Sequence, residues 1–411
     1  MSRPFQFFPL RFTLTLAIHL RGAVMRIRNA AQCATLALLI FTTRWISAQT
    51  PSPQEYSMSR DRAHQNLRGP VKSCKEETTL PAVSDVRAQI RSEYTTEFDR
   101  EGQEISTRIL QSDGSSWITR SDYSPSGQLL KVISGVEGKA LTKTSYIYDD
   151  QGRIQKIVPD SQGKVPISSQ PIAFHYDQHG RKTSTETSSA AEYRPNTASG
   201  LGAFEALEMP PNLPGGGTST TIYDEHDRPT EVEVRDAKGE LVMHATRTYD
   251  SQGRVTAEKQ FHDNLAPMFA PEAHEKILQE SGLSPEQLAT LVQAELPKLM
   301  GGNTEAYTVS YAYDVHGRVS HTSRRIFNQQ DEIDTAYNEQ GDMESEITRS
   351  TQIPGADGAP PEAGRSPYSE VRYSYQYDEH GNWTEKTTAY RSSPDENFQS
   401  PSTIKRTLTY Y

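Results

Sequence analysis

Polar and apolar residues alternate along much of the chain after residue 90, with the period of two that is typical of a half-buried strand. The segments 142–149 and 372–378 are the clearest examples, and in the second Tyr373, Tyr375 and Tyr377 fall on one face. Tyr and Thr, which favour strands, are abundant, with 20 Tyr in the chain. The pattern therefore predicts an all-β protein built from many short strands.

A turn motif separates these strands: an aromatic residue is followed by Asp, two polar residues and Gly. Asp at the first position of a type I turn accepts hydrogen bonds from the turn's own amides, and Gly takes positive φ in the bulge that follows. Each copy therefore predicts one β-hairpin, and Asp227, which replaces Gly in one copy, tolerates the same conformation. The copies begin at Phe98, Tyr123, Tyr148, Tyr176, Tyr223, Tyr249, Tyr313, Tyr337 and Tyr377. The residues expected to form the turns are Asp99, Gly102, Gly127, Asp149, Gly152, Asp177, Gly180, Asp224, Asp250, Gly253, Asp314, Gly317, Gly341, Asp378 and Gly381.

The spacing of the motif predicts where the chain carries insertions. Most copies start about 25 residues apart, which fits two strands and two turns. Three steps are longer, so we expect insertions at 189–217, 262–305 and 352–368, all at the edge of the sheet opposite the motif turns. The first and third are rich in Pro and Gly, which predicts loops.

The middle insertion predicts a helical hairpin near 271–297. Ser284 is a suitable N-cap, Pro285 occupies the first helical position and Gln287 follows the cap by three residues, which is the pattern of a capping box. We expect its apolar stripe to pack on the sheet.

The fold class expected from these patterns is all-β: an elongated, twisted antiparallel sheet of about nine consecutive hairpins with a small α-helical hairpin insertion. The repeat domain should span 71–411. Residues 49–70 are polar and predict either a short capping helix or a disordered segment.

Residues 1–48 predict a signal peptide. From Met25, an alternative start, a basic segment precedes the apolar run CATLALLIF and small residues, and this order is what the secretory machinery recognises. We expect cleavage after Ala48. The alternative is a retained membrane anchor, for which the apolar run is shorter than the ~20 residues that span a bilayer.

The repeated units resemble a known family. In several copies Arg follows the Gly, as at Arg153, Arg181, Arg254 and Arg318, and these Tyr-Asp-x-x-Gly-Arg units resemble the YD repeats of the RHS and teneurin class over roughly residues 90–411. The resemblance implies hairpins in a long curving sheet, and loosely implies carbohydrate binding and adhesion. Typical members carry a C-terminal toxin. Residues 405–411 predict a last strand, so we expect the resemblance to be to a short member without a toxin.

The charge and the cysteine content limit the classes of binding partner and the cellular compartments that we expect. The chain has 43 Lys and Arg against 53 Asp and Glu, and residues 1–48 contain six Arg and no acid. The acidic remainder argues against binding nucleic acid or anionic lipid through overall charge. After cleavage only Cys74 remains, so an internal disulfide cannot form. We expect an exported protein that is periplasmic, at the cell surface or extracellular.

Catalytic motifs are absent from the sequence. It contains no nucleophile elbow, P-loop, dinucleotide fingerprint, EF-hand spacing or HExxH pair. The His residues that recur at the turn corners belong to hairpins roughly 10 Å apart, too far to share one metal ion. We therefore expect no enzyme activity, no cofactor and no metal.

Aromatic residues at fixed spacing on the strand faces are the candidate binding residues, because exposed rings can stack on sugar rings. The alternative is cross-strand packing, with each pair stabilising the sheet by about 0.2–1 kcal/mol. Trp117 and Trp383 are the two we expect to be exposed. The candidates are Trp117, Trp383, Tyr146, Tyr311, Tyr373 and Tyr375.

These features predict an exported, non-enzymatic β-repeat binding or scaffold protein of the cell envelope. Its expected partner is envelope polysaccharide or another protein, with no nucleic acid and no stable membrane span in the mature chain. The alternative is a truncated relative of RHS toxin-shell proteins that acts as a carrier or companion to a toxin system. The oligomeric state stays open, because an open sheet has two edges that invite pairing.

Overall fold

The structure, a computed structural model, describes residues 62, 65–80, 90–111, 113–160, 171–187, 203–208, 213, 215–264, 282–284, 286–287, 290, 294, 305–326, 329–352, 367–399 and 402–411. The signal-peptide prediction lies outside these residues. The strands described are β1 (Val71–Leu80), β2 (Ile90–Phe98), β3 (Glu104–Leu110), β4 (Ser116–Tyr123), β5 (Leu129–Val136), β6 (Thr142–Tyr148), β7 (Ile154–Asp160), β8 (Ile172–Tyr176), β9 (Lys182–Thr187), β10 (Gly217–Tyr223), β11 (Pro229–Asp236), β12 (Leu241–Tyr249), β13 (Val255–His262), β14 (Glu305–Tyr313), β15 (Val319–Ile326), β16 (Gln329–Tyr337), β17 (Met343–Gln352), β18 (Tyr368–Tyr377), β19 (Trp383–Arg391) and β20 (Ser402–Tyr410), and the helix is α2 (Ala203–Glu208).

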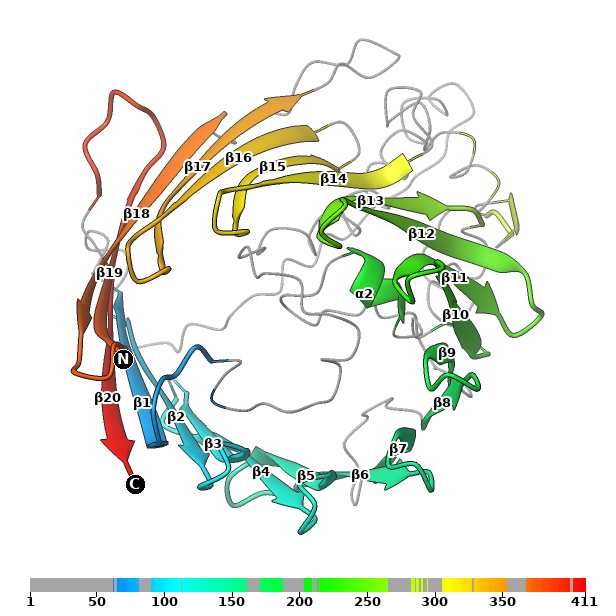
Figure 1. Ribbon diagram of the computed structural model, residues 1–411, viewed down its shortest axis with the longest axis horizontal. Helices are drawn as coiled ribbons and strands as arrows, with labels where there is room; N and C mark the ends of the chain where they lie inside the picture. The colour runs from blue at the N-terminus through cyan, green and yellow to red at the C-terminus, as the bar shows by residue number, and fades with distance from the viewer. Residues whose placement is uncertain are drawn as a thin grey trace.

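The twenty strands form one closed antiparallel sheet. Each strand pairs with the next along the chain, and β20 pairs with β1, so that the sheet returns to its starting edge as a barrel (Figure 1). In the closing pair Glu76 lies opposite Arg406 and Cys74 opposite Leu408. The expectation of an elongated sheet was wrong. The motif specifies each hairpin, but twist and tilt accumulate from strand to strand until the edges meet, and closure leaves no unpaired edge.

The motif turns and the insertions lie at opposite ends of the strands. The nine motif turns join β2 to β3 and every second pair of strands after that, up to β18 and β19, whereas the insertions join β9 to β10, β13 to β14 and β17 to β18. This arrangement follows from the antiparallel meander, because alternate connections fall at alternate ends.

The helical elements differ from those expected. At Ser284 and Gln287 the two capping hydrogen bonds form, at 3.2 and 2.8 Å, and the described residues 286, 287, 290 and 294 are helical. Residues 271–281 lie outside the described residues, so a helical hairpin is not among the elements described between β13 and β14. The described helix, α2, lies in the insertion expected to be a loop. It forms because Phe204 and Leu207, three residues apart, bury completely or almost completely against the sheet. Among the described residues, the structure has no helix that is both long and apolar enough to cross a membrane.

The position of α2 identifies the inner face of the barrel. In Figure 1 the helix lies inside the ring, beside β10 to β13. Ser219 Oγ donates to the Leu207 carbonyl at 2.5 Å and Thr185 Oγ1 to the Glu208 carbonyl at 2.7 Å. Side chains on this face of β9 and β10 therefore point inward, and the pairing register between neighbouring strands carries the same face around all twenty strands.

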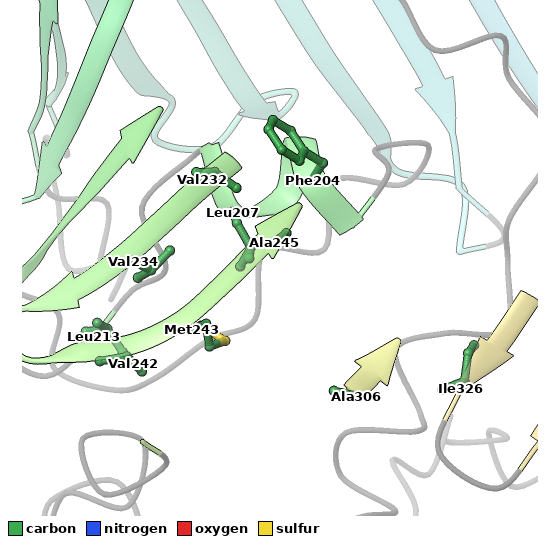
Figure 2. Close-up of a cluster of buried hydrophobic side chains, with 10 residues drawn as sticks. All are labelled: Phe204, Leu207, Leu213, Val232, Val234, Val242, Met243, Ala245, Ala306 and Ile326. Carbon is green, nitrogen blue, oxygen red and sulfur yellow. The ribbon is translucent and has the colours of Figure 1, made fainter. Parts of the chain in front are cut away.

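Two apolar clusters stabilise the barrel. The larger joins α2 to the sheet, and Figure 2 shows its side chains. The smaller lies where the barrel closes: Leu67, Val71, Cys74 and Phe98 pack with Leu408 from β20. The larger cluster contains Phe204, Leu207, Leu213, Val232, Val234, Val242, Met243, Ala245, Ala306 and Ile326.

Candidate functional site

Five of the motif turns are held by their Asp and by the Arg that follows the turn. Asp224 Oδ1 accepts the backbone amides of His226 and Arg228, both at 2.9 Å, and Oδ2 accepts Arg228 Nε at 2.8 Å. The Arg228 side chain and these amides lower the pKa of Asp224 to about 2. Asp227 sits at φ +60°. The carboxylates of Asp99, Asp149, Asp177, Asp250, Asp314 and Asp378 accept the equivalent amide, and φ is +78° to +95° at Gly102, Gly127, Gly152, Gly180, Gly253, Gly317, Gly341 and Gly381.

The motif tyrosines connect one hairpin to the next. Tyr249 Oη donates to the Pro229 carbonyl, the first residue of the second strand in the preceding hairpin, at 2.7 Å. The Arg228 guanidinium lies over the Tyr249 ring, 4.7 Å from its centroid, and burial raises the pKa of this phenol. The sequence did not predict this link. Equivalent bonds are donated by Tyr123, Tyr148, Tyr176, Tyr223, Tyr313 and Tyr337. In the last copy Tyr375 donates this bond in place of the motif residue Tyr377.

A Tyr249→Phe variant is expected to lose about 0.5–1.5 kcal/mol of its free energy of unfolding, because the ring stays while the link to the Pro229 carbonyl is lost. Urea unfolding followed by far-ultraviolet circular dichroism measures the change. Tyr390→Phe is the matched control: Tyr390 is 37% exposed and should lose much less. Equal losses in the two variants would show that the interhairpin hydrogen bond does not stabilise the barrel.

The six candidate aromatic residues come from five strands, and all lie on the inner face. Trp117 on β4 is opposite Ile109 and Val136, and both Trp117 and Ile109 are 38% exposed. Solvent therefore reaches an apolar part of the inner face. Tyr146 lies opposite Ile157 and Tyr311 opposite Thr322, and Tyr373, Tyr375 and Trp383 gather on β18 and β19.

This last group forms an aromatic and cationic cluster. The Tyr375 and Trp383 centroids are 6.4 Å apart. Lys386 Nζ lies 4.3 Å from the Tyr373 centroid and 5.7 Å from that of Tyr375. The Arg406 guanidinium stacks 3.5 Å from the Trp383 centroid. Trp383 is thus covered on one side, and in this respect it differs from Trp117.

The two cations of the cluster have different surroundings. Arg406 Nε donates to Glu76 Oε1 at 2.7 Å across the closing strand pair, whereas its Nη1 is buried without a hydrogen-bond partner. Burial and the nearby Arg406 lower the pKa of the Lys386 ammonium. Burial also raises the pKa of Tyr373 to about 12, so this phenol keeps its proton at neutral pH.

A second charged group lies beneath α2. Arg247 Nε and Nη2 both donate to Glu258 Oε1, at 2.9 and 2.6 Å, and Nη2 also contacts Glu205. Burial, and the neighbouring Glu205, raise the pKa of Glu258 although Arg247 opposes the shift. In the sequence, both charged groups are marked only by charged residues at positions that point inward. These positions can be recognised only when the register of the strands is known.

The described residues offer no group of three or more His, Cys, Asp or Glu able to hold a metal ion. The turn histidines are exposed, and the backbone amide of each donates to its own Asp, as at His226. Chemically, the inner face therefore offers aromatic faces, hydroxyl groups and charged side chains, among them the cations Lys386, Arg406 and Arg247.

Comparisons with known proteins identify no family. No family model matches the chain, and no curated protein matches it. A porin-like protein from Bacteroides uniformis is 9% identical, with 83% of this chain and 98% of that chain covered and a TM-score of 0.30. A porin-like protein from Bacteroides vulgatus is 11% identical, with 84% and 99% covered and a TM-score of 0.16. The Tc holotoxin pore of Photorhabdus luminescens is 12% identical, with 76% of this chain and 15% of that chain covered and a TM-score of 0.34.

The YD-repeat assignment and the toxin-shell alternative are corrected accordingly. The resemblance implied an elongated curving sheet, whereas the chain closes into a barrel of twenty described strands. The shared Tyr-Asp-x-x-Gly-Arg pattern indicates a β-hairpin turn, and such turns occur in antiparallel sheets of any family. At these identities and TM-scores the porin-like neighbours carry no argument about function or compartment.

Proposed function

We propose that this protein is an exported, non-catalytic binding protein of the cell envelope that holds an envelope glycan against the inner face of its barrel. The observation that carries the proposal is that all six candidate aromatic residues point to that one face. Aromatic faces stack on the C–H faces of sugar rings, and the neighbouring hydroxyl groups can bond to sugar hydroxyls. The solvent exposure of Trp117 and Tyr390, 38% and 37%, makes part of this face accessible.

Ion pairs on the outer face of the barrel favour an outer surface that is in contact with water. Lys75 pairs with Glu93 at 2.9 Å and Lys405 with Glu385 at 3.4 Å on outward positions of their strands. Strands that face lipid carry an outward apolar band, and charges there are costly. We therefore propose that the glycan site is internal and that the outer surface faces an aqueous compartment.

The test is co-sedimentation of the purified protein with insoluble envelope polysaccharide and peptidoglycan, at low and high salt. We expect retention that resists salt, because stacking is not screened as exposed charges are. A Trp117→Ala variant should bind about tenfold more weakly, since removing a Trp that contacts a ligand costs about 1–2 kcal/mol or more. Ile147→Ala changes a residue that is 44% exposed on the outer face and should bind like the parent protein.

Two results would contradict the proposal. Absence of retention on both materials would point to a protein partner instead of a glycan. Retention that is equally weakened by Trp117→Ala and Ile147→Ala would show that binding does not use the inner face.

A further inference from the structure

The ammonium group of Lys386 has an unusual environment on the inner face. Its contacts in the described structure are with the Tyr373 and Tyr375 rings, and within that part of the chain neither Lys386 Nζ nor Tyr373 Oη takes part in a hydrogen bond. Lys386 is half-buried, and a cation held partly away from water normally pairs with a carboxylate or finds acceptors. Within the described residues, the Lys386 ammonium group therefore has N–H donors without hydrogen-bond acceptors and a positive charge without a carboxylate partner.

The two carboxylates whose charges act on Lys386 already have partners, and a third carboxylate, Glu346, acts on Tyr373. Glu76 accepts Arg406 Nε, and Asp342 accepts the Tyr377 hydroxyl at 2.8 Å. Arg406 adds a second positive charge that disfavours the charged form of Lys386. An anion placed at Lys386 would offset the repulsion between Lys386 and Arg406 and would accept hydrogen bonds from the Lys386 N–H groups.

The rings around Lys386 limit the shape of that anion. Lys386 lies opposite Tyr375 and Ile404 in the sheet, so it stands within a patch formed by Tyr373, Tyr375 and Trp383. On β19 the same face continues through Thr388 to Tyr390, which is 37% exposed. A ligand that fits these groups has a flat or weakly polar ring face and an anionic group at its edge.

We propose that this cluster on β18, β19 and β20 binds the carboxylate of an acidic sugar, such as a uronic acid, with Lys386 Nζ and Tyr373 Oη as donors and the aromatic rings as the stacking surface. The proposal rests on the proposed glycan-binding function and specifies one sugar class within it. A carboxylate fits because charge-assisted hydrogen bonds from an ammonium group are short and strong. The neutral Tyr373 phenol supplies a second donor.

Isothermal titration calorimetry on the full protein tests the site with trigalacturonic acid and with the same trisaccharide after reduction of its carboxylates to hydroxymethyl groups. We expect the acidic form to bind roughly ten- to hundredfold more tightly. Lys386→Met keeps the length of the side chain and should abolish this preference. Tyr373→Phe keeps the ring and should weaken the acidic form roughly two- to tenfold.

Lys405→Met is the matched control, because Lys405 is a lysine on the neighbouring strand whose side chain is 64% exposed on the outer face; its preference should equal that of the parent. Thermal melting of every variant checks that the barrel is folded. Equal binding of both trisaccharides, unchanged in Lys386→Met, would overturn the acidic-sugar site and leave the glycan-binding function standing. If the protein binds inorganic phosphate but neither trisaccharide, the assignment of the site to a sugar is overturned. If the parent protein is not retained on envelope material in the co-sedimentation test, the proposed function itself is overturned.

Discussion

An Arg247→Met variant is expected to lose about 3–5 kcal/mol of its free energy of unfolding. The Arg247 side chain is only 3% exposed, and its partners Glu205 and Glu258 are 3% and 0% exposed. Its guanidinium also lies over the Phe204 ring, 4.2 Å from the centroid. Removing the cation leaves two carboxylates next to each other in an apolar setting, where an unpaired charge is costly.

Chemical denaturation of the parent and variant proteins measures this loss. Arg235→Met is the control, because Arg235 pairs with Glu233 at 2.8 Å while its side chain stays 40% exposed, and exposed pairs contribute about 0–1 kcal/mol. The double variant Arg247→Met, Glu258→Gln should recover part of the loss, since one of the stranded charges is then removed. If Arg247→Met costs no more than Arg235→Met, the buried ion group does not hold α2 to the sheet.

The sequence predicted the hairpins because their information is local. Tyr249, Asp250 and Gly253 lie within five residues, and each has a role that short-range physics defines. The Asp caps the turn amides and the Gly supplies the positive φ, +79° here. The same locality explains why the motif resembled a family without establishing one.

Closure could not be read from the sequence, because it depends on the summed twist and tilt of many strands. Glu76 and Arg406 are separated by 330 positions, and no local pattern links them. The aromatic candidates were chosen as residues on strand faces, and which of the two faces is internal followed only from the closed register. Lys386 and Arg247 were missed because an inward-facing charge looks like any other charge until the register is known.

The helix α2 was missed for a different reason. It has six residues, AFEALE, and lies in an insertion rich in Pro and Gly, so too few positions are available to show a helical period. Phe204 and Leu207 drive its formation through burial, and the polar contacts of Arg247 and Glu205 fix it in place. Tertiary packing thus overrides a composition that favours a loop.

A chain that ends after Gln399 lacks β20, and we expect it to self-associate. The truncation exposes the hydrogen-bonding edges of β1 and β19, removes the Arg406–Glu76 bond and uncovers Val71 and Cys74, which pack with Leu408 in the intact barrel. Unpaired edges of long strands pair with other chains. Size-exclusion chromatography with light scattering should therefore show dimers or larger species at concentrations where the intact chain has a single defined mass.

The control is a chain that lacks only Tyr411. It loses the hydrogen bond from the Tyr411 hydroxyl to the Phe98 carbonyl, at 2.5 Å, but keeps the whole of β20, so its mass should equal that of the intact chain. If the chain ending after Gln399 has the same mass and the same unfolding transition as this control, closure does not stabilise the sheet. The array of hairpins would then be stable with two open edges, and the elongated sheet expected from the sequence would describe it better than a barrel.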